Sequence, residues 1–430
     1  MKVLFAVSAW AGHYSCMVPL GWALQAAGHE VHVAVAPSAA DGIAEAGLTA
    51  VPVLDTLDLN VMRRMAYFQE AADGQWNLPG LPPHPLTGEP VGSLDDFDIA
   101  TEGPKYWAEC GAALSRSYDG AVAYAREWRP DLVVYDLMSA EGALAAKLLD
   151  VPSVYFPFGL IGNVETEPGV DLGDGDPSGS WPRYGQPPWR GDQIEYVIDV
   201  SPRGARPPVG DALRIPLRYV PYNGPARLPD WLRDPGPGRR VTILWGNSAT
   251  GGFGTELPVL RHAVDAAAGA ADTVYLAANA AQVAALDTLP GNVRVLRGFP
   301  LHLLLSLSDL VIHHGSANPA MNAACVGTPQ LALALNEEQQ TVSGRMAATG
   351  ASRVLPGLGA EAEAVRRTVR ELLDDASCQK AARRVAETIA AQPTPARLVP
   401  ALEHLAATGR LDRRDLDRLT AARPALADTP

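Results

Sequence analysis

Cysteine is scarce in this sequence of 430 residues, which has four scattered cysteines and no C-x-x-C spacing. A structural zinc site or a disulfide framework would need paired cysteines, so the sequence argues against both. We therefore expect reduced thiols and a cytoplasmic protein. The four cysteines are Cys16, Cys110, Cys325 and Cys378.

Positive charge is also in short supply, because 35 Lys and Arg stand against 48 Asp and Glu and give a net charge of -13. This excess of negative charge argues against nucleic acid or an anionic membrane as the main partner. No apolar run approaches the length of a membrane span. The opening "MKVLFAVSAWAGH" is too short for a typical signal peptide, and we interpret it as a first buried strand.

Two common nucleotide-binding motifs are missing. A dinucleotide-binding domain should carry G-x-G-x-x-G after its first strand, whereas the turn "SAWAGHYS" contains one glycine. No G-x-x-x-x-G-K-[ST] segment occurs either. The sequence thus argues against a nicotinamide oxidoreductase and against a P-loop NTPase.

The sequence does contain repeated strand–helix units. Runs such as "KVLFAV", "DLVVY" and "VTILW" alternate with helical patterns and predict parallel sheets covered on both faces. At this length we expect two α/β domains, with a ligand cleft between their strand ends. The expected division is a first domain over 1–222, a linker over 223–240, a second domain over 241–392, and over 393–430 a helix, which could pack back on the first domain, and a polar tail.

Two segments interrupt this rhythm, residues 67–105 and 162–194, and both are dense in proline, glycine and aromatic residues. Loops of this length in a compact domain are usually functional, so they are candidates for binding a substrate. Plain surface insertions are the alternative interpretation.

Residues 309–340 read "DLVIHHGSANPAMNAACVGTPQLALALNEEQQ". A strand leads into two histidines and a glycine, and Asn318 as N-cap with Pro319 in the first turn predicts a helix that Gly327 ends. The start of a helix offers unpaired N–H groups and a positive dipole end, which favour a phosphate. Histidines that merely cap a strand end are the other interpretation.

With these segments the chain resembles the GT-B glycosyltransferases of family 1, which include bacterial antibiotic and plant secondary-metabolite enzymes. The similarity covers nearly the whole chain, from "GHYSCMVPLGWALQAAGHEV" through "LRYVPYNGPARLPDWL" to the histidine–glycine segment. The resemblance implies two Rossmann-like parallel-sheet domains facing across a cleft. It also implies an inverting hexosyl transfer of a (deoxy)sugar, often dTDP-linked in bacterial members, to a small natural-product aglycone.

The bacterial members typically read H-H-G-G-A-G-T-T-L-E-A, then G-V-P-Q and D-Q. Here Glu338 replaces the aspartate, and Asn322 replaces the glutamate that pairs with ribose. Pro319 removes one backbone N–H from the phosphate cradle. The implied sugar contacts are Glu338 and Gln339. The implied nucleotide and phosphate contacts are Ser248, Phe299 (stacking on the base), His313, His314, Gly315, Ser316, Ala317, Asn318 and Asn322.

The resemblance makes His13 the catalytic base and Asp136 its carboxylate partner. Imidazole suits the task because its pKa lies near working pH. A structural role for His13, or a strand-end cap for Asp136, stays open. We also expect acceptor contacts from the aromatic residues of the long segments and strand ends, and no cofactor or metal, because no D-x-D motif ends a strand in the second half. The expected acceptor contacts are Tyr67, Trp76, Trp107 and Phe158.

Two alternatives to the transferase remain at this point. A nucleotide-sugar epimerase can share the fold, and the changes at Ser316, Pro319 and Asn322 are compatible with a non-catalytic auxiliary partner of another transferase. The expected partners are a nucleotide sugar and a small aglycone, with no nucleic acid and no membrane, and the protein is expected to be a monomer or a homodimer.

Overall fold

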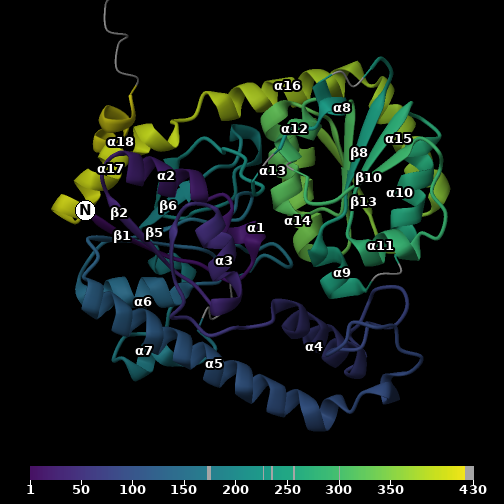
Figure 1. Ribbon diagram of the computed structural model, residues 1–430. Helices are drawn as coiled ribbons and strands as arrows, with labels where there is room; N and C mark the ends of the chain where they lie inside the picture. The colour runs from purple at the N-terminus through teal and green to yellow at the C-terminus, as the bar shows by residue number, and fades with distance from the viewer. Residues whose placement is uncertain (172–175, 226, 234–235, 255–256, 300, 422–430) are drawn as a thin grey trace, which may run out of the picture.

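The computed structural model describes residues 1–171, 176–225, 227–233, 236–254, 257–299 and 301–421. Within these residues the first parallel sheet has seven strands in the order β3-β2-β1-β4-β5-β6-β7 (Figure 1). Its strands are β1 (Lys2–Ala6), β2 (Glu30–Ala34), β3 (Thr49–Val51), β4 (Leu132–Tyr135), β5 (Ser153–Tyr155), β6 (Tyr196–Asp199) and β7 (Leu213–Pro216).

The second parallel sheet has six strands in the order β10-β9-β8-β11-β12-β13. With the first sheet, it confirms the predicted pair of parallel-sheet α/β domains. Its strands are β8 (Arg240–Leu244), β9 (Thr273–Ala277), β10 (Val293–Leu296), β11 (Leu310–His313), β12 (Gln330–Ala334) and β13 (Ser352–Pro356).

Register brings the chemically important turns together. Ala6 at the end of β1 is opposite Tyr135 at the end of β4, so the residues after both strands share one edge of the first sheet. In the second sheet, His313 at the end of β11 is opposite Leu244 at the end of β8. Both edges carry the carboxyl ends of strands, where ligands bind in open α/β sheets.

Helices cover both faces of the first sheet (Figure 1). The segment 67–105, predicted as one long loop, is partly helical: α4 runs to residue 72 and α5 begins at residue 99, which leaves 73–98 as the connection. The helices are α1 (Ala11–Tyr14), α2 (Val18–Ala26), α3 (Pro37–Glu45), α4 (Leu59–Ala72), α5 (Ile99–Trp128), α6 (Ala140–Leu149) and α7 (Ser180–Arg183), with short 3-10 turns at Leu94–Asp96, Gly191–Gln193 and Arg203–Ala205.

The later helices surround the second sheet and then return to the first. A short helix, α8, lies within the segment expected to be a plain linker, and the segment expected as a polar tail begins with α18, in which Leu416 is buried. The helices are α8 (Asp230–Arg233), α9 (Asn247–Phe253), α10 (Pro258–Ala268), α11 (Ala280–Ala285), α12 (Leu301–Leu305), α13 (Ala317–Val326), α14 (Glu337–Ala347), α15 (Ala362–Asp374), α16 (Ala376–Ala390), α17 (Pro395–Thr408) and α18 (Arg413–Thr420).

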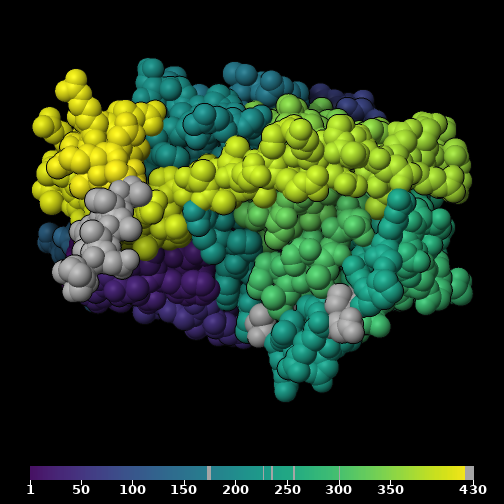
Figure 2. All heavy atoms as spheres, turned by 90° about the horizontal axis from the view of Figure 1, so that it is seen from above, coloured from purple at the N-terminus to yellow at the C-terminus, as the bar shows by residue number. Residues whose placement is uncertain are grey.

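The chain end ties the two halves together. Seen from above, α16 and the segment after it cross from the second domain to the first (Figure 2). There α17 packs on α2, and Glu403 Oε1 lies 2.8 Å from His29 Nε2. One apolar cluster includes Phe158 and Leu160 of the first domain together with Met321 and Val342 of the second. Burial of this shared surface favours a defined arrangement of the two domains.

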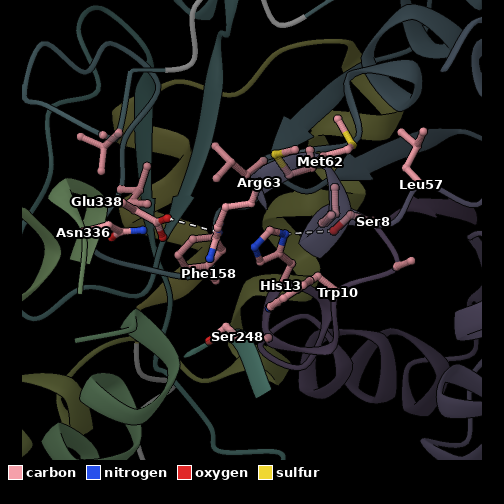
Figure 3. A pocket seen from close by; sticks show the side chains of 18 of the residues that line it. Ser8, Trp10, His13, Leu57, Met62, Arg63, Phe158, Ser248, Asn336 and Glu338 are labelled. Atoms are coloured by element: carbon pink, nitrogen blue, oxygen red, sulfur yellow. Dashed lines mark hydrogen bonds and ion pairs between the residues drawn. The ribbon is translucent and has the colours of Figure 1, made fainter. Parts of the chain in front are cut away.

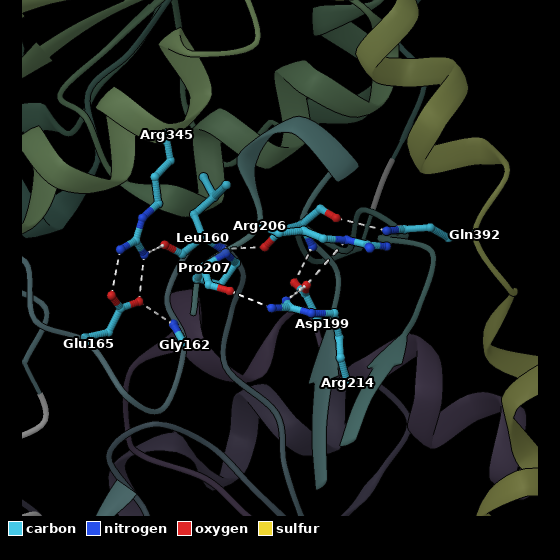
Figure 4. A network of polar contacts seen from close by, with 10 residues as sticks. Leu160, Gly162, Glu165, Asp199, Arg206, Pro207, Arg214, Arg345 and Gln392 are labelled. Carbon is cyan, nitrogen blue, oxygen red and sulfur yellow. Dashed lines mark hydrogen bonds and ion pairs between the residues drawn. The ribbon is translucent and has the colours of Figure 1, made fainter. Parts of the chain in front are cut away.

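A polar network reinforces that arrangement beside the apolar cluster (Figure 4). Arg345 on α14 donates two hydrogen bonds to the Glu165 carboxylate, at 2.7 and 2.6 Å, and a third to the carbonyl of Leu160 at 2.7 Å. Glu165 also accepts from the backbone N–H of Gly162. The loop predicted over 162–194 is therefore attached, near its start, to the second domain.

Candidate active site

A cavity of about 970 Å³ lies between the two domains, at the carboxyl ends of both sheets. From the first domain it is lined by the turn after β1, by α4, and by the start of α6. From the second domain it is lined by the first residues of α9, α13 and α14. Of the residues predicted for the site, those on the wall are His13, Tyr67, Trp76, Phe158, Ser248, Ser316, Asn318, Glu338 and Gln339.

His13 stands on this wall in the short helix α1, directly after β1 (Figure 3). Its Nδ1 lies 2.9 Å from Ser8 Oγ, and Ser8 Oγ donates to Asp136 Oδ2 at 2.8 Å. The direct distance from His13 Nδ1 to Asp136 Oδ2 is 4.0 Å. The expected direct His–Asp pair is thus bridged by a serine hydroxyl, which the sequence did not single out.

These bonds determine which nitrogen of His13 is free. The Asp136 carboxylate can only accept, so the Ser8 hydroxyl proton points to it, and Ser8 Oγ is left to accept from His13 Nδ1–H. The other ring nitrogen, Nε2, then carries a lone pair. Burial lowers the pKa of His13, and the Asp136 charge opposes this effect without reversing it. The result at neutral pH is an uncharged imidazole, the form that a general base requires.

Asp136 itself is almost fully buried, with 1% of its surface exposed, and it does not line the cavity. The backbone N–H groups of Ser8 and Met138 donate to its two oxygens at 2.8 Å. Phe158 stacks on the His13 ring at 4.6 Å between centroids and an angle of 18°. The imidazole is therefore fixed both at its edge and on its face.

The part of the cavity in the first domain is mainly apolar, and it includes Tyr67, Trp76 and Phe158, three of the predicted acceptor contacts. Trp107, the fourth predicted acceptor contact, does not line the cavity. It lies on an outward face of α5 with 38% of its surface exposed, and its ring meets Tyr106 edge-on. The apolar wall includes Leu57, Met62, Leu114, Leu137, Met138, Ile161, Val170 and Trp189.

One acid interrupts this apolar wall. Glu141, in the first turn of α6, is 4% exposed, and its Oε2 has no hydrogen-bond partner among the described residues. Burial raises the pKa of Glu141 to about 8, and Asp136 and Asp176 contribute in the same direction. The side chain is therefore a neutral carboxylic acid at pH 7. No motif in the sequence marks this position.

The second domain presents the start of α13 to the cavity. The helix begins at Ala317 rather than at Pro319, and Ser316 takes the N-cap position without a side-chain cap bond. Asn318 is therefore inside the first turn and is not the N-cap. Ser316 and Asn318 line the cavity, where the unpaired N–H groups of this turn can face an anion.

His314 supports this end of the cavity from behind. It is 2% exposed, and its Nε2 lies 2.9 Å from Ser248 Oγ, which is on the wall. Burial lowers the pKa of His314 to about 4 and that of His313 to about 3. Neither histidine contributes positive charge at neutral pH, so any anion here is held by hydrogen bonds rather than by imidazolium.

Six of the nine predicted nucleotide contacts do not line the cavity. His313 contacts Gln330 and accepts from the N–H of Gly315, while Asn322 donates to Tyr219 and Asn318. Gly315 has φ +89°, and an added Cβ would meet Gln339 and Ala334 within 2.9 to 3.1 Å, so packing requires this glycine. Phe299 contacts Trp231 instead. The predicted contacts that do not line the cavity are Phe299, His313, His314, Gly315, Ala317 and Asn322.

Glu338 and Gln339 begin α14 and do lie on the wall. Glu338 Oε2 is 3.7 Å from Arg63 Nη2, and burial raises the pKa of Glu338 although Arg63 opposes that effect. Gln339 Oε1 accepts from the N–H of Leu335. Glu338 is thus the freer of the two side chains.

Neither a metal site nor a membrane-spanning helix is found among the described residues. No group of three or more His, Cys, Asp or Glu side chains is arranged to hold a metal ion there. Within the same residues, no helix has the length and apolar character needed to cross a membrane.

Comparison with known proteins places this geometry in a family. The chain matches both domains of the erythromycin biosynthesis protein CIII-like proteins. The N-terminal domain matches residues 22–73 and 114–246, and the C-terminal domain matches residues 261–405. The chain is 33% identical to aklavinone 7-beta-L-rhodosaminyltransferase of Streptomyces galilaeus, with 95% of this chain and 97% of the relative covered. It is 32% identical to aclacinomycin-T 2-deoxy-L-fucose transferase of the same organism, with 96% and 98% covered.

Among solved structures, glycosyltransferase VinC in complex with dTDP superposes with a TM-score of 0.71 and 29% identity, over 95% of this chain and all of VinC. The relatives named here are transferases, which favours that activity over an epimerase or an auxiliary protein. Two parallel-sheet domains with a cavity between them agree with these matches. The chain belongs to the erythromycin biosynthesis protein CIII-like family and is a GT-B glycosyltransferase of antibiotic biosynthesis.

Proposed function

We propose that this protein is an inverting transferase that moves a deoxysugar from a dTDP-linked donor to a hydroxyl of a small natural-product aglycone. The observation that carries this proposal is the His13–Ser8–Asp136 chain of hydrogen bonds, which leaves His13 Nε2 unprotonated at the cavity wall. Such a nitrogen can accept the proton of an acceptor hydroxyl.

In the proposed reaction the acceptor oxygen attacks the anomeric carbon as His13 Nε2 takes its proton. The bond between the anomeric carbon and the diphosphate oxygen breaks, and its electron pair leaves with the nucleoside diphosphate. Attack from the side opposite the leaving group inverts the anomeric centre. Asp136, through Ser8, stabilises the positive charge that appears on the imidazole.

Three features of the cavity support this substrate assignment. The start of α13 and Ser248 offer hydrogen-bond donors for the diphosphate, and Glu338 can accept from sugar hydroxyls. The apolar part of the cavity suits a hydrophobic acceptor. The names of the relatives, which include aklavinone and aclacinomycin-T, also motivate this choice of acceptor. A relative named for 2-deoxy-L-fucose and a neighbour bound to dTDP motivate the donor. In this scheme no cofactor or metal is needed.

The test is a transfer assay with dTDP-deoxysugars, and with the matching UDP-sugars, against a panel of polyketide and aromatic aglycones. We expect a glycoside whose mass matches the donor, dTDP released in equal amount, and an inverted anomeric centre by NMR. Addition of EDTA should leave the rate unchanged. Release of dTDP without any glycoside, or a product with retained configuration, would contradict the proposal.

A further inference from the structure

The charge of the cavity wall presents a problem for a nucleoside diphosphate. The acidic residues on the wall are Asp55, Glu70, Glu141, Asp171, Glu337 and Glu338. Asp55 is paired with Arg116 at 2.6 Å, and Glu141 is protonated, but the carboxylates of Glu70, Glu337 and Glu338 oppose an anionic ligand. Among the described residues that line the wall, Arg63 is the one lysine or arginine.

The phosphate end of the cavity does not supply the missing charge. Its two histidines are neutral, because burial lowers the pKa of His313 to about 3 and that of His314 to about 4. Pro319, within the first turn of α13, has no N–H to donate. The remaining N–H groups and Ser248 can donate hydrogen bonds to a diphosphate. No group at this end of the cavity, however, offers it a full positive charge.

Arg63 comes from the other domain, on α4. This helix is seated on α9 of the second domain, where an added Cβ on Gly252 would lie 3.0 Å from Arg63 Cδ. Its neighbour Arg64 donates to the carbonyls of Pro85 and Gly251 at 2.8 and 2.5 Å. Arg64 thus holds the helix in place, and Gly252 leaves room for the Arg63 side chain to pass into the cavity.

The guanidinium of Arg63 is available for a ligand. In the described part of the chain it makes no hydrogen bond, and its one ion pair, to Glu338 at 3.7 Å, is longer than a hydrogen bond. Figure 3 shows the side chain reaching between His13 and Glu338, with Ser248 across the cavity. Its charge lowers the pKa of both His13 and His314, as expected for a cation near the base and the phosphate end.

We propose that Arg63 is a catalytic residue that binds the diphosphate and neutralises it as it leaves. This inference rests on the proposed function. Before the donor binds, Glu338 keeps the guanidinium in the cavity; when the diphosphate arrives, Arg63 pairs with it and Glu338 is released to the sugar hydroxyls. As the bond to the anomeric carbon breaks, the diphosphate gains one negative charge and His13 gains one proton. The guanidinium of Arg63 is a planar, positively charged donor suited to phosphate, so it stabilises the negative charge that the diphosphate gains.

The experiment compares Arg63→Gln and Arg63→Lys with the wild type, with calorimetric titration of dTDP and thymidine and with turnover at saturating donor. We expect Arg63→Gln to raise the Kd of dTDP about 10- to 100-fold and to lower kcat by a similar factor, while the Kd of thymidine stays the same. Arg63→Lys should recover part of both losses. Arg367→Gln on α15, where Arg367 is 64% exposed, removes the same charge outside the cavity and should behave as wild type.

Two outcomes would overturn the inference. One is an Arg63→Gln variant that binds dTDP and turns over like Arg367→Gln. The other is a loss confined to the KM of the acceptor, which would place Arg63 on the aglycone instead. Failure of the proposed function looks different, because the wild type itself would then transfer no sugar, whereas its affinity for dTDP would still depend on Arg63.

Discussion

Ser8 makes the basicity of His13 depend on a carboxylate that the imidazole does not touch. The hydroxyl donates to Asp136 and accepts from His13, so its single proton sets the direction of both bonds. A chain of this kind orients the ring and selects its tautomer. The chemistry of the site therefore rests on three side chains from two neighbouring strand ends.

His13→Ala should lower kcat by about 10²- to 10⁴-fold with an alcohol acceptor, because the proton then has no general base. The Kd of dTDP should stay nearly constant, since in the proposed reaction His13 contacts the acceptor hydroxyl and not the nucleotide. Single-turnover kinetics at saturating donor measure the first quantity and calorimetry the second. His29→Ala, which changes a histidine that contacts Glu403 on α17, is the matched control. Wild-type turnover by His13→Ala would remove the residue from the reaction.

Ser8→Ala should lower kcat by about ten-fold or more, because His13 loses the partner that fixes its tautomer. Ser8→Thr retains the hydroxyl and should recover activity. The decisive comparison is the double variant: if Ser8 acts through His13, adding Ser8→Ala to His13→Ala should cost nothing further. Additive losses would show that Ser8 acts independently, for example by packing.

Glu141→Gln should change how stability depends on pH. The pKa is raised from 4.5 to about 8, so between these values the folded state holds a proton that the unfolded state has lost. The contribution of Glu141 therefore weakens by about 1.4 kcal/mol for each pH unit of increase. Glutamine keeps the shape without titrating, so its advantage over the wild type in urea unfolding should grow from pH 5 to pH 8. Parallel profiles would contradict a buried protonated acid.

Sequence reasoning found the site residues that lie inside motifs and missed those brought in by tertiary structure. His13, Ser248 and Glu338 follow strand ends or begin a helix, and all line the cavity. Arg63 and Glu141 sit in ordinary helical sequence, and their approach to the site depends on how α4 and α6 pack. Residues within one motif can also point in opposite directions, which is why His313 and Asn322 face the protein interior.

At the scale of elements, the contact between α4 and α9 sets the position of α4, with Arg63 and Tyr67, relative to the second domain. An added Cβ on Gly251 would lie 1.8 Å from Asn60 Oδ1, so Gly251→Ala must displace the Asn60 side chain, and we expect the contact between α4 and α9 to loosen. We expect about a ten-fold loss of kcat/KM with a stability cost of about 1 kcal/mol, because the helix carries Arg63 and Tyr67 but few core residues. Gly269→Ala, at the end of α10 with φ -80°, is the control.

The readouts are steady-state kinetics and hydrogen exchange along α4. Faster exchange there in Gly251→Ala, together with the kinetic loss, would confirm the contact as the cause. Normal kinetics with a displaced α4 would show that the helix does not position substrate groups.

Strands were easier to predict than the helices of the first domain. Continuous apolar runs gave β1 and β8 almost to the residue, since buried parallel strands have no polar face. The first residues of the 30-residue α5 fall in a segment predicted as loop, since Gly103 and Pro104, which disfavour helix, lie inside it. The start of α5 packs on α4, where Ile99 and Tyr106 share an apolar cluster with Met65 and Phe68. This packing retains the helix despite the hydrogen bond that Pro104 cannot make.

For the whole molecule, the Glu165–Arg345 pair should be a main polar attachment between the domains. The Glu165 side chain is fully buried and that of Arg345 is 15% exposed, so Arg345→Ala would leave a carboxylate buried without its cation. We expect a loss of about 3–5 kcal/mol in unfolding free energy. The double variant Glu165→Met with Arg345→Met should lose much less, since neither charge remains.

Urea denaturation followed by tryptophan fluorescence measures these differences. Arg366→Ala removes an exposed pair with Glu363 and should change stability by about 1 kcal/mol or less. Equal effects of Arg345→Ala and Arg366→Ala would mean that the interdomain pair is solvated and holds nothing together.

The acidic cavity wall also bears on how a turnover ends. Once the sugar has moved, the nucleotide carries one more negative charge than it did as a donor, and it faces carboxylates with a single arginine to retain it. The glycoside that leaves beside it has no such charge. Electrostatic repulsion should therefore eject the spent nucleotide quickly and keep it from inhibiting the next cycle, and rising ionic strength should slow that exit without slowing departure of the glycoside.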